Sequence, residues 1–212
     1  YLACGYVAKG RMEEPMQILS VINKFFTQQK NVVKRSFYRK RALVTAGPTV
    51  EVIDPVRYVS NRSSGKMGYA IAEALRDKGA IVTLISGPTH LSLPEGINVV
   101  KVESADDMFQ AVTERFAKQD IVIKAAAVSD YTPMDILEHK LKKQEGGLSV
   151  QFKRTKDILK YLGENKTHQY LVGFAAETQN IEQYALDKLK RKNADVIISN
   201  NVGDTSIGFS SD

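Results

Sequence analysis

The chain has 212 residues, 43% of them hydrophobic and 25% charged, and carries a formal net charge of +6. These proportions are ordinary for a soluble globular protein with one domain and something appended, and no apolar run approaches the roughly 20 residues that span a bilayer. A single cysteine, Cys4, excludes an internal disulfide framework and fits the reducing cytoplasm. The first ten residues lack the apolar region of a signal peptide and begin without Met, so we expect a fragment of a cytoplasmic protein with no membrane partner.

The basic excess lies in the N-terminal segment. Residues 1–41 hold 9 Lys and Arg against 2 Asp and Glu, whereas residues 42–212 hold 21 against 22. A nucleic-acid-binding protein needs clustered positive charge on its folded body together with a recognisable motif, and the sequence has neither. The run KNVVKRSFYRKR therefore indicates a solvated linker, and we expect no nucleic-acid partner.

The first half of the chain alternates between helices and buried strands. Apolar residues with helical spacing predict an amphipathic helix over 13–29, and a linker over 30–40 follows it. A strand is expected next at 42–47, followed by a helix at 65–78 that ends at Gly79. Two further strands are expected at 80–87 and 98–103.

The second half continues the alternation and predicts the fold class. Ser104 and Asp107 form a variant of the capping box and predict a helix over 104–118. Three further strands are expected at 120–130, 170–178 and 195–201, with a helix at 180–193 between the last two. Strands rich in Val and Ile with helical crossovers predict an α/β fold with a doubly wound, mainly parallel, Rossmann-like sheet. Between 131 and 155 polar and apolar residues alternate around Gly146-Gly147, which predicts a projecting β-hairpin arm.

Small and polar residues lie at the ends of five of the six predicted strands. In such sheets ligands bind at the carboxyl ends of the strands, where small residues let a ligand approach the backbone and helix starts offer N–H groups to anions. Any one of these segments could be a plain turn, but five at one edge favour a binding site. The segments are TAGPT (45–49), SGPT (86–89), AAAVSDY (125–131), GFAAET (173–178) and SNN (199–201).

Two standard phosphate motifs and one catalytic motif can be tested against the sequence. Gly65-Lys66 resembles the end of a P-loop, but Ser60 replaces the first glycine and Met67 replaces the hydroxyl residue. The glycine fingerprint of dinucleotide-binding domains is absent after the first strand. Tyr184-x-x-x-Lys188 matches the catalytic pair of short-chain dehydrogenases, and without that fingerprint it is a weak signal.

Longer motifs carry a resemblance to a known family. They are AGPTVEVIDPVRYVSNRSSGKMGYAIAE, AAAVSDYTP, HKLKK, GFAAET and KLKRKN, in that order, between about residues 41 and 212. Together they resemble the phosphopantothenate–cysteine ligases, also called phosphopantothenoylcysteine synthetases. The resemblance implies CTP-dependent ligation of 4′-phosphopantothenate to L-cysteine through an acyl-cytidylate, with Mg²⁺, in coenzyme A biosynthesis. CMP and pyrophosphate would be released.

The resemblance also implies roles for residues around the anionic reactants. Lys140 would lie over the reacting phosphate, and Asn61 would contact the acyl-cytidylate with Arg57 beside it. The phosphopantothenoyl part would bind to Asn61, Ser63, Ser64 and Gly65. Asp130 would contact the ribose or hold Mg²⁺. The nucleotide site would comprise Ala125, Ala126, Ala127, Asp130, Lys140, Lys156, Asp157, Ile158, Leu159, Phe174, Lys188 and Lys192.

The N-terminal segment resembles a different enzyme. LACGYVAKGRMEEP is similar to the end of the flavin-dependent phosphopantothenoylcysteine decarboxylase, in which Cys4 would be the proton donor. Residues 1–40 would then be a remnant of that domain plus a linker, with FMN bound only in the missing part. Residues 41–212 would be a ligase domain that is incomplete at its C-terminus. The resemblance further implies a homodimer, for which the hairpin near 139–153 is the candidate contact.

Two other function classes remain open. A nicotinamide-dependent dehydrogenase would use Tyr184 and Lys188, and it would bind NADH. A non-catalytic regulator would bind CTP without releasing pyrophosphate. The choice of CTP over ATP rests on the resemblance, because a few backbone groups decide which base is bound.

Overall fold

The computed structural model describes residue 20 and residues 36–142, 148–177 and 181–201. The chain divides into two compact units, Tyr1–Ser36 and Phe37–Asp212, and all strands and helices named below belong to the second. The helix expected over 13–29 and Cys4 lie outside the described residues, and the assignment of residues 1–40 to another domain stays a prediction. Within the described ranges, no helix is both long enough and apolar enough to cross a membrane.

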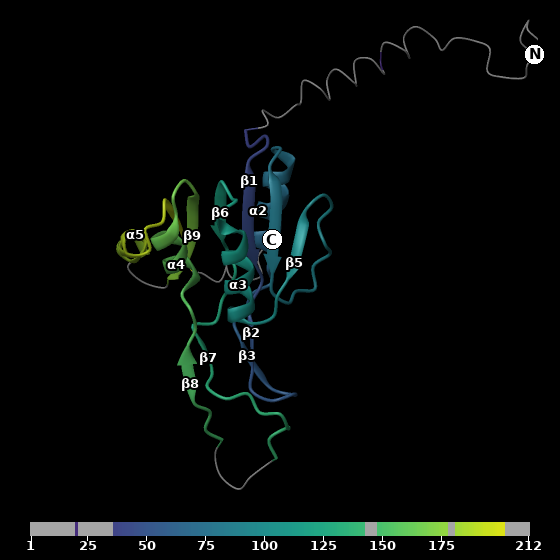
Figure 1. The fold of residues 1–212 in the computed structure, drawn as a ribbon, viewed down its shortest axis with the longest axis vertical. Helices are drawn as coiled ribbons and strands as arrows, with labels where there is room; N and C mark the ends of the chain where they lie inside the picture. The colour runs from purple at the N-terminus through teal and green to yellow at the C-terminus, as the bar shows by residue number, and fades with distance from the viewer. Residues whose placement is uncertain (1–19, 21–35, 143–147, 178–180, 202–212) are drawn as a thin grey trace, which may run out of the picture. The chain divides into compact units, whose positions relative to one another are not determined.

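A six-stranded parallel sheet forms the centre of the second unit (Figure 1). Its strands lie in the order β10-β9-β6-β1-β4-β5, and every pair of neighbours is parallel. This is the strand order of a doubly wound Rossmann-like sheet, so the predicted fold class is confirmed. The strands are β1 (Arg41–Ala46), β4 (Ile81–Ser86), β5 (Asn98–Lys101), β6 (Ile121–Lys124), β9 (Tyr170–Glu177) and β10 (Val196–Asn201).

Side chains of the central strands alternate between two hydrophobic clusters, one on each face of the sheet. Along β1, Leu43 belongs to one cluster, whereas Ala42 and Val44 belong to the other. Residues of α2 join the cluster of Val44, and residues of α3 and α4 join the cluster of Leu43, so helices cover both faces. The helices are α2 (Lys66–Asp77), α3 (Ala105–Phe116), α4 (Ile158–Asn165) and α5 (Ile181–Arg191).

Two short antiparallel pairs lie outside the central sheet (Figure 1). The first joins β2 (Val50–Val52) to β3 (Tyr58–Ser60), and the second joins β7 (Tyr131–Pro133) to β8 (Phe152–Arg154). The second pair is the base of the predicted arm, whose tip at 143–147 lies outside the described residues. The sequence signals did not predict the β2–β3 pair, because its strands have only three residues each and no alternating pattern of useful length.

The structure corrects one strand and adds one helix. The strand expected over 120–130 ends at Lys124. Beyond it the chain meets Pro48, which has no N–H to donate and forms only an isolated bridge with Ala127. Helix α4 was not predicted, although Asp157 caps it by accepting a hydrogen bond from the Lys160 N–H at 2.9 Å.

The predicted capping box is present at the start of α3, and it gives a first testable prediction. The Ser104 hydroxyl accepts a bond from the Asp107 N–H at 3.1 Å, and the Asp107 carboxylate accepts one from the Ser104 N–H at 2.9 Å. Ser104→Ala should therefore lower the free energy of unfolding by about 1 kcal/mol. Urea denaturation measures this change, and Lys118→Ala, at an exposed position just after the helix, is the control. Equal stabilities of the two variants would contradict the prediction.

Candidate functional site

The direction of the strand order reverses between β1 and β6, which lie side by side at the centre of the sheet (Figure 1). In doubly wound sheets the ligand crevice lies at this reversal, outside the carboxyl ends of the two strands. The loops that follow β1 and β6 contain the predicted segments TAGPT and AAAVSDY. The tertiary structure therefore brings two of the five predicted ligand-facing segments to the crevice position.

The stretch RYVSNRSSG, which leads into α2, packs against this edge. Gly65 is the N-cap of α2 with φ 79°, and a Cβ at this position would lie 3.3 Å from the backbone nitrogen of Gly47. Asn61 donates a hydrogen bond from Nδ2 to the carbonyl oxygen of Val128 at 3.1 Å. The predicted phosphopantothenoyl-binding residues and the AAAVSDY segment are thus held together.

Ser63 and Ser64 turn their hydroxyls toward the start of α2. The Ser63 hydroxyl accepts a bond from the Gly65 N–H at 3.3 Å, and the Ser64 hydroxyl accepts one from the Lys66 N–H at 3.4 Å. Both bonds are long for hydrogen bonds, so a ligand oxygen could replace either hydroxyl at little cost. The N-terminal turn of α2 is therefore suited to an anion.

Arg57, which is partly exposed, takes part in a hydrogen-bond network that fixes the segment carrying Lys140. Its guanidinium donates to the carboxylate of Asp54 at 2.8 Å and to the carbonyl oxygen of Leu141 at 3.2 Å. The Asp54 side chain is fully buried and also accepts a bond from the Leu141 N–H at 3.1 Å. Burial opposes ionisation of Asp54, but these donors outweigh it and hold its pKa below the usual value. Arg57 therefore positions the loop next to Lys140, which is itself exposed.

The structure places Lys124, which the sequence signals missed, at the carboxyl edge of the sheet. It is the last residue of β6, between Thr45 of β1 and Gly173 of β9, and it directly precedes the three alanines. Burial lowers its pKa to about 8, with Lys188 acting in the same direction while Asp157 and Asp130 oppose the shift. The signal available in the sequence was a lysine at the end of an otherwise apolar strand.

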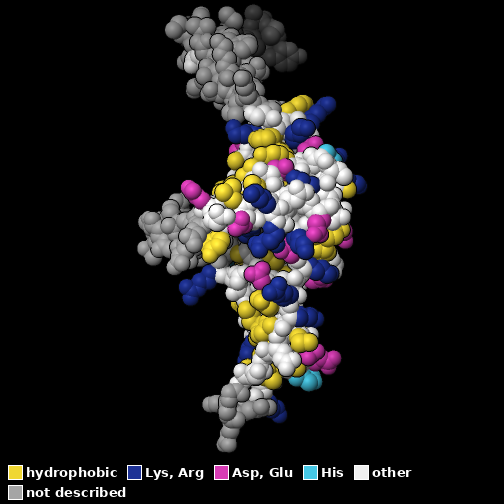
Figure 2. All heavy atoms as spheres, turned by 90° about the vertical axis from the view of Figure 1, so that its left-hand side faces the viewer, with side chains coloured by type: hydrophobic (Ala, Val, Ile, Leu, Met, Phe, Trp, Pro, Cys, Tyr) yellow, Lys and Arg dark blue, Asp and Glu magenta, His cyan; other side chains and the backbone are white. Residues whose placement is uncertain are grey.

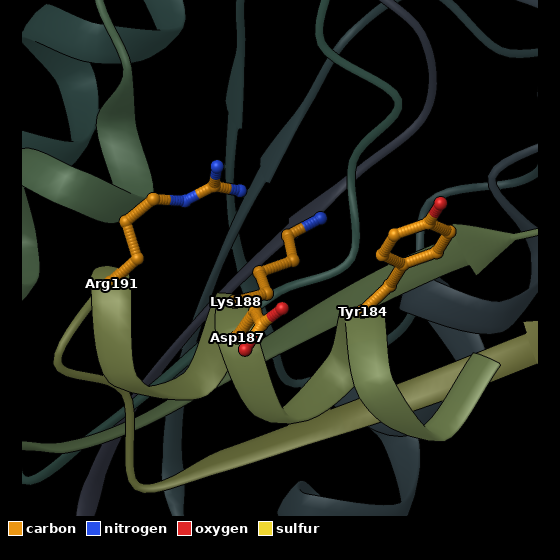
Figure 3. A pocket seen from close by; sticks show the side chains of 4 residues that line it. All are labelled: Tyr184, Asp187, Lys188 and Arg191. Atoms are coloured by element: carbon orange, nitrogen blue, oxygen red, sulfur yellow. The ribbon is translucent and has the colours of Figure 1, made fainter. Parts of the chain in front are cut away.

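Helix α5 supplies the other cations. Lys188 and Arg191 line an open pocket of about 330 Å³ with Tyr184 and Asp187. Figure 3 shows Lys188, Arg191 and Tyr184 extending to the same side of α5. Figure 2 shows Lys and Arg side chains gathered, with some acidic ones, across the middle of the face that carries α4 and α5.

Lys192, one turn beyond Lys188, forms an ion pair with Asp157 at the start of α4. Burial opposes ionisation of Asp157, but the bonds from Lys192 and from the Lys160 N–H outweigh it and lower its pKa. The Lys192 side chain is only 13% exposed, so its charge is committed to this pair. The expectation that both lysines reach a phosphate stays a prediction, and the ion pair with Asp157 limits the reach of Lys192.

Several other predicted nucleotide-site residues contact side chains within the protein. Ile158 and Leu159 are buried in the core, where they pack with other apolar side chains. Lys156 forms a 2.8 Å ion pair with Asp106 and lies 4.9 Å from the centre of the Phe109 ring. In the structure these three side chains serve core packing and surface ion pairing.

Asp130 and Phe174 remain near the carboxyl edge. Asp130 is exposed, and its carbonyl oxygen accepts a bond from the Thr155 N–H at 3.0 Å. Phe174 is half-buried on β9, beside Ile198 of β10. Among the described residues, no group of three or more His, Cys, Asp or Glu side chains is placed to hold a metal ion.

Comparison with known proteins shows the family. Residues 37–212 match the family DFP, described as the DNA/pantothenate metabolism flavoprotein C-terminal domain. The chain is 52% identical over 213 residues to the coenzyme A biosynthesis bifunctional protein CoaBC of Bacillus subtilis (strain 168), covering 100% of this chain and 52% of that protein. The chain thus spans about half the length of this relative.

Two solved structures share the fold. The crystal structure of the C-terminal domain of a coenzyme A biosynthesis bifunctional protein CoaBC has a TM-score of 0.72 and 50% identity, covering 79% of this chain and 80% of that one. The DNA/pantothenate metabolism flavoprotein from Streptococcus pneumoniae has a TM-score of 0.67 and 26% identity, covering 76% and 82%.

These comparisons contradict the activity that the resemblance implied. The family description names a flavoprotein, and none of the three proteins above is described as a CTP-dependent ligase. The assignment as the ligase half is corrected accordingly, together with CTP and Mg²⁺ as cofactors and FMN confined to a missing domain. The partners expected with it are corrected too: 4′-phosphopantothenate, L-cysteine, CTP and a separate decarboxylase domain.

Tyr184 and Lys188, the two residues that match the catalytic pair of short-chain dehydrogenases, both line the pocket on α5, and residues 37–212 match the DFP family. The chain belongs to the DFP family, the DNA/pantothenate metabolism flavoprotein C-terminal domain.

Proposed function

We propose that this chain binds a phosphorylated pantothenoyl compound, 4′-phosphopantothenoylcysteine, within a bifunctional coenzyme A biosynthesis enzyme. The observation that carries the proposal is the group of cationic side chains around the carboxyl ends of β6 and β9. Lys124 lies at the end of β6, and Lys188 of α5 is close enough to lower its pKa. The name of the Bacillus subtilis relative, a coenzyme A biosynthesis bifunctional protein, supports the choice of ligand class.

The edge of the sheet matches the two charged ends of this compound. Its phosphate is a dianion at neutral pH and its cysteine end carries a carboxylate, so both ends need cations or N–H donors. Lys124 and Lys188 supply cations on one side, and the start of α2 at Gly65 supplies N–H groups on the other. Three alanines after Lys124 let the pantothenoyl chain approach the backbone.

The flavin named in the family description can be compared with these residues. The pocket on α5 is lined by one tyrosine and three charged side chains, Asp187, Lys188 and Arg191. The isoalloxazine ring of a flavin is flat and largely apolar, and such ligands are bound between apolar and aromatic walls. The pocket residues therefore fit a phosphate group and do not fit the flavin ring.

The first experiment is isothermal titration calorimetry of the 212-residue chain with 4′-phosphopantothenoylcysteine. Pantothenoylcysteine, which lacks the phosphate, is the matched control ligand. We expect the phosphorylated compound to bind at least tenfold more tightly, since one charge-assisted contact contributes about 1.5–3 kcal/mol. Equal affinities for the two compounds would overturn the proposal.

A second assay asks which reaction the bound compound undergoes. Because the family is described as a flavoprotein, release of CO₂ from 4′-phosphopantothenoylcysteine in the presence of FMN is the reaction to test. CO₂ release by the chain would assign decarboxylation to it. Tight binding without CO₂ release would assign it a binding role within the longer enzyme.

Lys188 gives the most direct variant for this function. Lys188→Gln removes the charge from the pocket and should weaken binding of 4′-phosphopantothenoylcysteine about tenfold. Lys190→Gln is the matched control, because Lys190 is exposed and lies about 200° further around the same helix. Both affinities are measured by calorimetry at constant ionic strength. Equal losses in the two variants would indicate a general charge effect and not a contact at Lys188.

We also place this function in the cytoplasm. A single cysteine in 212 residues suits a compartment in which disulfides do not form.

A further inference from the structure

Lys124 occupies the position in the fold where a ligand would meet the sheet. It ends β6 at the reversal of the strand order, with Thr45 beside it on β1 and Gly173 beside it on β9. Neither neighbour is large, and the residues that follow are alanines. A ligand lying across the carboxyl ends of β1, β6 and β9 would therefore come close to the lysine.

Three charged side chains from different elements influence the pKa of Lys124. Asp157 acts from the start of α4, Asp130 from the loop after β6, and Lys188 from α5. Asp157 is already bonded to Lys192 and to the N–H of Lys160, and Asp130 is exposed to solvent. The two carboxylates therefore compensate the charge of Lys124 only in part, and Lys188 repels it.

We propose that Lys124 is a ligand-binding cation that takes up a proton when an anionic group of the ligand binds beside it. This inference rests on the proposed function, in which that group belongs to 4′-phosphopantothenoylcysteine. The phosphate and the carboxylate of the compound share the required chemistry. Near pH 8 and above, Lys124 is partly neutral without ligand, and the arriving anion supplies the missing charge partner.

The expected pH dependence follows from the pKa of Lys124, which burial lowers to about 8. Below this value the side chain is already charged, and above it binding must first add a proton. The charged fraction falls from about 90% at pH 7 to about 10% at pH 9, so the affinity should fall about tenfold over this range. The free energy of unfolding of the chain without ligand depends on pH in the opposite direction to the affinity. The unfolded chain binds more protons between pH 8 and 10.5, so this group makes stability rise with pH there.

Calorimetry in two buffers with different ionisation enthalpies measures the proton directly. At pH 8 the wild-type chain should take up about half a proton more than Lys124→Arg on binding 4′-phosphopantothenoylcysteine, because arginine is always charged. The ligand's own titration is common to both proteins and cancels in this difference. Lys124→Met should bind about tenfold more weakly at pH 7, and circular dichroism shows whether each variant is folded.

The outcomes separate this inference from the proposed function. The role of Lys124 alone would be overturned if the wild type binds, Lys124→Arg takes up as many protons as the wild type, and a folded Lys124→Met binds with unchanged affinity. Pantothenoylcysteine, which has the carboxylate but no phosphate, shows which group of the ligand lies beside Lys124. Proton uptake that persists with this compound places the carboxylate there, and proton uptake that disappears places the phosphate there. Failure of the wild type to bind either compound would overturn both proposals.

Discussion

Replacing Leu84 with alanine should lower the free energy of unfolding by about 2–5 kcal/mol. Leu84 lies in the middle of β4, has no exposed surface, and packs in the cluster that also contains Val44 and Leu75. Its strand pairs with β1 on one side and β5 on the other, so the backbone cannot collapse into the space that the side chain leaves. The variant therefore loses the burial of three carbon atoms and also leaves a cavity.

Ile81 provides the matched control for this measurement. It lies at the start of the same strand, but 59% of its surface is exposed. Ile81→Ala should change the free energy of unfolding by no more than about 0.5 kcal/mol. Urea denaturation followed by circular dichroism measures both variants. A loss below about 1 kcal/mol for Leu84→Ala would show that the core between β4 and α2 repacks easily.

Replacing Gly87 with alanine should destabilise the chain by about 3 kcal/mol or more and should also weaken ligand binding. A Cβ at this position would lie 1.7 Å from the carbonyl oxygen of Pro48. The obstacle is backbone, which cannot rotate away as a flexible side chain could. The loops after β1 and β4 would have to separate, and Pro48 would move together with Ala127, to which it is bridged. The effect therefore reaches the segment after Lys124.

Gly173→Ala is the control for the Gly87 variant. Its Cβ would approach only the ends of the side chains of Leu159 and Ile197, at 2.8 and 2.9 Å, and these can shift. We expect a loss of about 1 kcal/mol for this variant. Thermal unfolding compares the stabilities, and calorimetry with 4′-phosphopantothenoylcysteine compares the affinities. A Gly87→Ala chain that binds as tightly as the wild type would show that the edge tolerates separation of these loops.

The accuracy of the sequence predictions differed with the length of the element. The six central strands and the helices at 66–77, 105–116 and 181–191 were predicted within one or two residues, except for the C-terminal end of β6. Their apolar patterns are long enough for the period to be read. The end of β6 was wrong because it depends on Pro48, which is distant in sequence and cannot extend the ladder.

The candidate site was found in part. The structure brings Asn61 and Gly65 to the loops after β6 and β1 and places Lys188 in a pocket, while their roles in ligand binding stay predictions. Lys124 was missed because one lysine at a strand end has no distinctive neighbours in the sequence. Its neighbours in space, Asp157 and Lys188, come from helices that follow it by more than 30 residues.

Long motifs predicted the correct fold, and a relative of the chain is named a coenzyme A biosynthesis bifunctional protein, but the reaction inferred from the motifs is contradicted by the family description. A fold and its binding edge can serve different chemistry, since the reaction depends on groups that meet only in the assembled site.

The sequence by itself determined the doubly wound sheet, the faces that become buried and the edge at which we expect a ligand, because these follow from local periodicity and from the chain order of the strands. Only the tertiary structure decided the surroundings of the charged side chains. Lys156 and Lys192 form ion pairs with aspartates, Ile158 and Leu159 are buried in the core, and Lys124 acquires its lowered pKa. Burial and ion pairing depend on groups that are distant in the sequence, so a local sequence pattern cannot predict them.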